Sequence, residues 1–140
     1  MDRRGTLLVV EDEAVLRSLV SHFLRHEGYD VSEAEDGGEG VRRFREEGPF
    51  DLILLDLNLP VFSGVEVSRQ VKEERPDQKI MILSAVIVRE HEEALRKIGV
   101  NHFLTKPYHP ENLLAHIRLE LNRNGGLRES GSKQIPPSPA

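Results

Sequence analysis

The chain of 140 residues has a formal net charge of −5, an ordinary globular composition and no cysteine, so one domain with a proper core fits this length and two do not. No apolar run is long enough to span a membrane, and the first one is too short for a signal peptide, so the cytoplasm is the default location. The absence of cysteine excludes a disulfide or a thiolate metal site, and the absence of a lysine–arginine cluster argues against direct nucleic-acid binding.

The first half of the chain alternates strand-like and helix-like segments. Apolar runs predict strands at residues 7–10, 29–34 and 52–56. Between them, apolar residues at three- and four-residue spacing predict a helix around residues 16–24 and a weaker one at 39–47. The run at residues 52–55 is unbroken, which is typical of a strand buried on both faces of a parallel sheet.

The second half repeats this alternation. A loop leads to helix signals around residues 67–71, 94–98 and 110–121, and strands are predicted at residues 80–84 and 100–105. Five β–α repeats with right-handed crossovers predict an α/β fold with a doubly wound, five-stranded parallel sheet of the flavodoxin-like kind. We expect this domain to cover residues 1–124. Residues 125–140 are rich in glycine, serine and proline, so they are expected to form a disordered tail or a linker.

Polar side chains follow the predicted strands at their carboxyl ends, the edge where open α/β sheets bind ligands. They are Glu11, Asp12, Asp56, Ser84 and Lys106. Three carboxylates brought together would repel, so the site needs a cation. Because the available ligands are hard oxygens, including the carbonyl of Asn58 or a neighbour, Mg²⁺ is expected, with Mn²⁺ as the alternative.

A small divalent ion held by two carboxylates usually has a phosphate as a further ligand. Lys106 would then be a point charge on phosphoryl oxygens, and the Ser84 hydroxyl a donor to another oxygen. One oxygen of Asp56 would bind the metal, and the other would be free to attack phosphorus and form an acyl phosphate. A single acid after a strand is more often a helix cap, and a single lysine a surface residue. The hypothesis therefore depends on five such groups at strand ends.

These motifs resemble the receiver domain of two-component response regulators, which has the CheY-like fold. The resemblance covers residues 5–122 and rests on residues 9–13, 54–60, 84–85 and 103–107 with Gly64 and Gly99. It implies that Asp56 accepts a phosphoryl group from a histidine kinase or a phosphotransfer protein. It also implies self-catalysed transfer and autodephosphorylation, not turnover of a metabolite. The implied Mg²⁺ ligands are Asp12, Asp56, Asn58 through its backbone carbonyl and Glu11 through water.

The resemblance also implies a switch. Ser84 and Lys106 match the family's hydroxyl and lysine, Phe103 matches its switch aromatic, and the Lys106–Pro107 bond would be cis. A phosphoryl group adds up to two negative charges at the sheet edge. By analogy, Ser84 would move toward it and Phe103 would rotate into the space behind. This would bias the surface formed by the fourth helix, fifth strand and fifth helix, which a downstream target protein or output domain would read.

The loop after Ser84 departs from the family pattern, because it is apolar at Val86, Ile87 and Val88. One interpretation is that these residues extend the fourth strand or tuck under the fourth helix. The other is an apolar docking or homodimer patch beside the switch surface. The second predicts that Ile87→Asp weakens self-association or partner binding without unfolding the domain.

Two rival functions share part of this pattern. A haloacid-dehalogenase-type phosphatase also uses an aspartate at a strand end, but it needs a second acid where this chain has Asn58 and a cap domain for which there is no length. An unphosphorylated receiver-like binding module is the other rival. The intact set of Asp12, Asp56, Ser84 and Lys106 argues against it.

Overall fold

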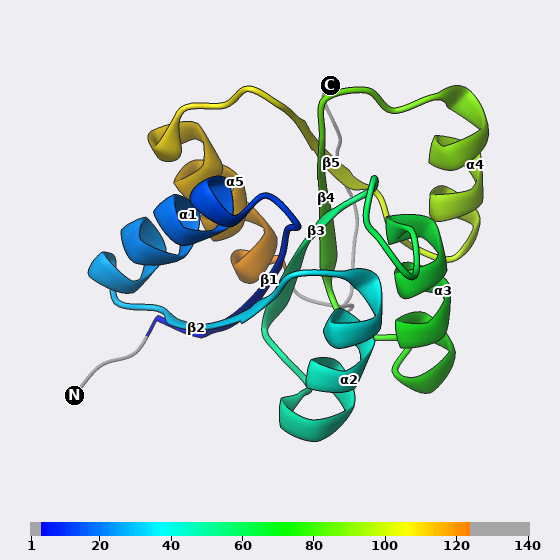
Figure 1. Cartoon of the computed structure of the whole chain (residues 1–140), viewed down its shortest axis with the longest axis horizontal. Coiled ribbons are helices and arrows are strands. Elements are labelled where there is room, and N and C mark those ends of the chain that lie inside the picture. Colours follow the sequence, from blue (N-terminus) through cyan, green and yellow to red (C-terminus); the bar gives the residue numbers. More distant parts are fainter. Residues whose placement is uncertain (1–3, 124–140) are drawn as a thin grey trace.

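A computed structural model describes residues 4–123 as one parallel sheet with helices on both faces (Figure 1). The strands are β1 (Thr6–Val10), β2 (Asp30–Ala34), β3 (Leu52–Asp56), β4 (Ile80–Ser84) and β5 (His102–Thr105). The helices are α1 (Ala14–His26), α2 (Gly37–Glu47), α3 (Gly64–Glu74), α4 (Arg89–Lys97) and α5 (Pro110–Asn122). The strand order is β2-β1-β3-β4-β5, with every neighbouring pair parallel, which confirms the predicted doubly wound fold.

The strands at the centre of the sheet are apolar throughout because both of their faces are covered. In β3, Ile53 and Leu55 belong to the core beneath α2, α3 and α4, whereas Leu52 and Leu54 belong to the core beneath α1 and α5. Figure 1 shows the same division, with α1 and α5 on one side of the sheet and the other three helices opposite. Alternate side chains of a strand point to opposite faces, so two layers of helices require an unbroken apolar run.

Some element boundaries and one buried position differ from the sequence prediction. β5 begins at His102 and not at residue 100, and α2 begins at Gly37, two residues earlier than predicted. The side chain of Asp36 accepts a hydrogen bond from the backbone N–H of Glu39 and so caps α2. Leu19 fits the apolar three- and four-residue spacing that predicts α1, which favours a buried position, but 63% of it is exposed. Its exposure leaves an apolar surface on α1.

The predicted tail or linker at residues 125–140 lies outside the described residues, as does the proposed domain boundary at residue 124. Among the helices that the structure describes, none combines the length and apolarity needed to cross a bilayer. The Lys106–Pro107 peptide bond is cis, as the resemblance implied.

Candidate functional site

The three predicted acids meet at the carboxyl ends of β1 and β3. The two strands are parallel neighbours and Val10 pairs with Leu55, so the residues that follow them lie side by side. Carboxylate oxygens of Glu11, Asp12 and Asp56 all lie within 4.8 Å of one another. Glu11 and Asp56 are buried, with 5% and 7% exposure, whereas Asp12 faces solvent. The convergence expected from the sequence is therefore confirmed.

Lys106 joins this cluster from the loop after β5. Its Nζ donates to Oε1 of Glu11 at 2.7 Å and to Oδ2 of Asp56 at 3.1 Å. Burial alone would lower the pKa of Lys106, but the hydrogen bond to Glu11 and the charge of Asp56 bring it above its usual value. Burial raises the pKa of Glu11, against the hydrogen bond that it accepts from Lys106. The ammonium group is bonded to two of the three carboxylates, and the site keeps an excess of negative charge.

The loop between β3 and α3 folds back closely over the end of β3. The backbone N–H of Asn58 donates to Oδ1 of Asp56 at 3.3 Å, and that of Gly64 donates to the carbonyl of Leu57 at 2.8 Å. A side chain at position 64 would collide with the carbonyl oxygen of Asp56, which explains the glycine there. Val61 is held at φ 73°, a backbone region that a β-branched residue rarely adopts. The loop that borders the acid cluster is therefore both tight and strained.

Ser84 lies at the same edge of the sheet but its hydroxyl is engaged elsewhere. It ends β4, beside β3, and is fully buried. Its Oγ donates to the carbonyl of Val86 at 3.0 Å and forms no hydrogen bond with the acid cluster. The sequence correctly placed Ser84 at the rim, but the direction of its hydroxyl could be seen only in the structure.

Phe103, the predicted switch aromatic, packs on the α4 side of the sheet. It is partly buried and contacts the core there together with Ile87 and Ile98. The guanidinium carbon of Arg96 lies 5.0 Å from the centre of its ring. Sequence reasoning missed Arg96, because a charged residue near a helix end gives no signal that it covers an aromatic ring.

The apolar loop after β4 divides into a buried and an exposed part. β4 ends at Ser84, so the expectation that the loop extends this strand is wrong. Ile87 packs against the core on the α4 side, which agrees with the expectation that the loop tucks under the fourth helix. Val86 and Val88, in contrast, are 67% and 44% exposed. An aspartate at position 87 would place a charge against the core, so a test of surface association belongs at Val86.

The donor set at the rim fits a hard divalent cation. All of the clustered ligand atoms are carboxylate oxygens, and the described residues bring no histidine into the cluster. Mg²⁺ prefers oxygen ligands and is commonly held by one or two carboxylates. Arg17, which the sequence did not indicate, stabilises the loop from below by donating from Nη1 to the carbonyl of Glu11 at 2.8 Å. Its Nε pairs with Glu33 at 3.3 Å, so its charge is shared with a carboxylate outside the cluster.

Comparison with curated proteins shows a consistent family. The chain matches the family model described as response regulator receiver domain over residues 7–118. The probable transcriptional regulatory protein TcrX of Mycobacterium tuberculosis is 35% identical over 130 residues, which cover 93% of this chain and 55% of that protein. The phosphate regulon transcriptional regulatory protein PhoB of Escherichia coli is 36% identical over 84% of this chain and 52% of its own length. The chain therefore spans about half the length of these relatives.

Solved structures agree with this result. The chemotaxis protein CheY4 of Vibrio cholerae is 31% identical, with a TM-score of 0.76 over 82% of this chain and 97% of that one. A CheY-like receiver domain from Methanospirillum hungatei is 28% identical, with a TM-score of 0.79 over 84% of this chain and 93% of that one. With its acid cluster at the carboxyl edge of a five-stranded parallel sheet, the chain belongs to the family of response regulator receiver domains.

Proposed function

We propose that this receiver domain is a phosphorylation-operated switch in which Asp56 is the phosphoryl acceptor. One observation carries the proposal: the Asp56 carboxylate lies within 4.8 Å of two further acids and 3.1 Å from the Nζ of Lys106. Asp56 and Glu11 both join a potential cation site to a positive charge suited to phosphoryl oxygens, and of the two the resemblance to the receiver family assigns the acceptor role to Asp56. Members of this family are regulators and not true enzymes, so we expect one modification per switching event.

The transfer would exchange a nitrogen–phosphorus bond for an oxygen–phosphorus bond. An oxygen of the Asp56 carboxylate attacks phosphorus of a phosphohistidine, and the imidazole nitrogen leaves with the bonding electron pair. Lys106 offers its charge to the phosphoryl oxygens, at the cost of its bonds to Glu11 and Asp56. Attack of water on the same phosphorus returns Asp56 and inorganic phosphate, which is the autodephosphorylation that we propose.

When bound, Mg²⁺, or Mn²⁺ in its place, would neutralise part of the negative charge on the phosphoryl group. The residues that would hold it are Asp12 and Asp56 directly, Asn58 through its backbone carbonyl and Glu11 through water. Asp12 is the exposed member of the cluster and therefore the ligand that an arriving ion would meet first.

The phosphoryl donor that we propose is a histidine kinase or a phosphotransfer protein in the cytoplasm. An apolar groove between α1 and the start of α5 is lined by Leu16, Leu19, Val20, Phe23, Tyr108, Pro110 and Leu113. Exposed Val15, in the first turn of α1, precedes Leu16 in the chain and lies near the acid cluster in the sequence. An apolar helical surface that carries a phosphohistidine would bury this groove on docking.

Downstream of the switch, we propose that an output domain or a separate target protein reads the state of the α4–β5–α5 surface. The relatives named as transcriptional regulatory proteins are about twice as long as the matched region, so an output part joined through residues 125–140 is one form of this proposal. We propose no direct contact of this domain with nucleic acid. A homodimer through exposed Val86 and Val88 is a further proposal, which Val86→Asp should weaken in analytical ultracentrifugation.

The test is the intact mass of the protein after incubation with acetyl phosphate, with and without Mg²⁺. Asp56→Asn is compared with Asp51→Asn, a matched control because Asp51 precedes the opposite end of the same strand and is exposed. We expect one Mg²⁺-dependent phosphoryl adduct in the wild type and in Asp51→Asn, and none in Asp56→Asn. If the wild type forms no adduct and does not bind beryllofluoride, the unphosphorylated binding module is the better description.

A further inference from the structure

Arg96 is held over the ring of Phe103 by contacts with α4 and with the loop before β5. Its Nε and Nη2 lie 3.0 and 2.9 Å from Oε2 of Glu92, one turn earlier on α4. Its Nη1 donates to Oδ1 of Asn101, just before β5, at 3.4 Å. The guanidinium carbon is thereby placed 5.0 Å from the centre of the Phe103 ring. No sequence pattern indicates this arrangement, because it joins the end of α4 to the start of β5.

A guanidinium group at this distance attracts the face of an aromatic ring, and its flat shape allows it to stack there. The Arg96 side chain is about half exposed, so the attraction is at the weaker end of such contacts. A weak contact is nevertheless sufficient to bias two conformations whose free energies differ by only a few kcal/mol.

Two further contacts mark this conformation as the unswitched one. The Ser84 hydroxyl is bonded to the carbonyl of Val86 and not to a group at the acid cluster. Phe103 packs against the core on the α4 side of the sheet, as Ile87 and Ile98 do. If Ser84 turned toward Asp56 and Phe103 followed it inward, the ring would leave Arg96. The contact between ring and guanidinium therefore exists in only one of the two states.

We propose that Arg96 is a positioning residue that holds Phe103 against α4 and so favours the resting state of the switch. This inference rests on the proposed function, since it concerns the regulation of the same Asp56 site. A contact that forms in just one of the two states stabilises that state. It therefore lowers the apparent affinity of any ligand that binds the other state. Loss of the Arg96 guanidinium should thus tighten the binding of a phosphoryl mimic at Asp56, although Arg96 does not touch that site.

A purely structural role for Arg96 has to be separated from this one. Arg96 lies in the last turn of α4, where a positive charge also stabilises the helix end. That role would be shared by the adjacent Lys97, which is exposed in the same turn. Lys97→Met is therefore a matched control, because it removes the same charge from the same turn. Unlike Arg96→Met, it leaves the Phe103 contact in place.

The experiment measures the affinity of wild type, Arg96→Met and Lys97→Met for beryllofluoride with Mg²⁺ by titration calorimetry. We expect Arg96→Met to bind about two- to fivefold more tightly than wild type, which is what an exposed cation–π contact corresponds to, and Lys97→Met to bind like wild type. Equal affinities in all three proteins, or the same change in both variants, would overturn the role of Arg96.

A second variant protects the test against a folding defect. Glu92→Gln keeps Arg96 but loosens its guanidinium, so it should tighten beryllofluoride binding in the same direction and by less. If Arg96→Met does not fold, an unchanged beryllofluoride affinity of Glu92→Gln would contradict the inference. Failure of the wild type to bind beryllofluoride at all would instead refute the proposed function, so the two failures are distinguishable.

Discussion

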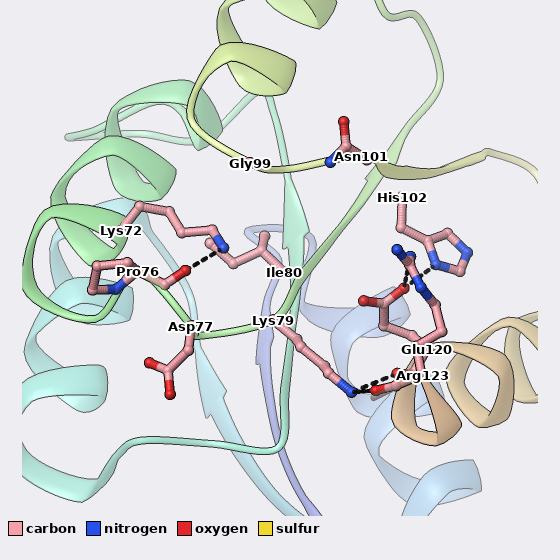
Figure 2. Close-up of a pocket in the computed structure, with 10 residues that line it drawn as sticks. All are labelled: Lys72, Pro76, Asp77, Lys79, Ile80, Gly99, Asn101, His102, Glu120 and Arg123. Carbon is pink, nitrogen blue, oxygen red and sulfur yellow. Dashed lines mark hydrogen bonds and ion pairs between the residues drawn. The ribbon is translucent and has the colours of Figure 1, made fainter. Parts of the chain in front are cut away.

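The two ends of the central sheet carry polar clusters of opposite character. At the carboxyl end, Glu11 and Asp56 share the ammonium group of Lys106, and Asp12 adds a third carboxylate to the cluster. At the amino end, a pocket beside β4 and the start of β5 is lined by charged side chains from α3, α5 and the adjoining loops (Figure 2). The first cluster has surplus charge, whereas the cations of the second are bonded to nearby oxygens.

The bonds of the second cluster account for each of its cations. Lys79 donates to the backbone carbonyls of Glu120 and Arg123 at 2.8 and 2.6 Å, and so caps the end of α5. Lys72 donates to the carbonyl of Pro76 at 2.9 Å. The buried Glu120 carboxylate accepts from Arg123 at 3.0 Å and bonds to His102 at 2.8 Å, as Figure 2 shows. Balanced charges of this kind stabilise the fold, whereas surplus charge at a rim leaves room for a ligand.

The largest effect should follow from removing the carboxylate of the balanced cluster. Glu120→Ala leaves Arg123 and His102 without their partner, and we expect a loss of about 2 kcal/mol in the free energy of unfolding. Urea unfolding followed by circular dichroism measures this. Glu90→Ala, at an exposed position of α4, serves as the control and should change stability little. Equal stability of the two variants would show that the amino-end cluster does not hold α5 to the sheet.

A gain in stability is expected at the rim. The positive φ of Val61, in the loop beside the acids, costs free energy in the folded protein. Glycine adopts this conformation without a steric penalty. Val61→Gly should therefore raise the free energy of unfolding by about 1 kcal/mol. Val15→Gly or Val86→Gly would not share this gain, since their side chains are exposed without a positive φ. Thermal unfolding of Val61→Gly below that of wild type would contradict strain at this position.

The smallest effect concerns pH at the balanced end. Nε2 of His102 lies 2.8 Å from Nδ1 of His116, and one proton can lie between them. Burial lowers the pKa of His116 from its ordinary 6.5, and the nearby His102 lowers it further. The unfolded chain therefore takes up the proton at a higher pH than the native protein. The contribution of the neutral His116 to the free energy of unfolding is fully present above about pH 6.5. It declines as the pH falls through that value toward the lowered pKa of the native protein.

Other charged groups also face this histidine pair. Burial alone would raise the pKa of Glu120, but the hydrogen bond with His102 and the charges of Arg123 and Lys79 bring it below its ordinary value. Urea unfolding at pH 7.5 and 5.5 should show that wild type loses more of its free energy of unfolding at the lower pH than His116→Gln does. His22→Gln, an exposed position on α1, is the control. If His116→Gln loses as much stability at pH 5.5 as wild type does, this histidine is not the source of the loss.

Much of the fold and the rim followed from the sequence because both depend on regular spacing. An unbroken apolar run such as that before Asp56 requires cover on both faces, and parallel strands bring their carboxyl ends to one edge. The bonding of Ser84 to Val86 and the cover of Phe103 by Arg96 depend on rotamers, which no spacing rule determines. Leu19 fitted the apolar stripe of α1 but is exposed, because a groove and not a core lies beside it.

The central claim is that surplus carboxylates at the rim form a divalent-cation site, and the Mg²⁺ dependence of stability tests it most directly. Urea unfolding of wild type and Asp12→Asn is measured over a series of Mg²⁺ concentrations. Wild type should gain about 1.4 kcal/mol for each tenfold increase above its Kd. Asp12→Asn should show no such rise and should be at least as stable as wild type without metal, because one repelling charge is gone. A flat response in wild type, or the same rise in both proteins, would contradict the account.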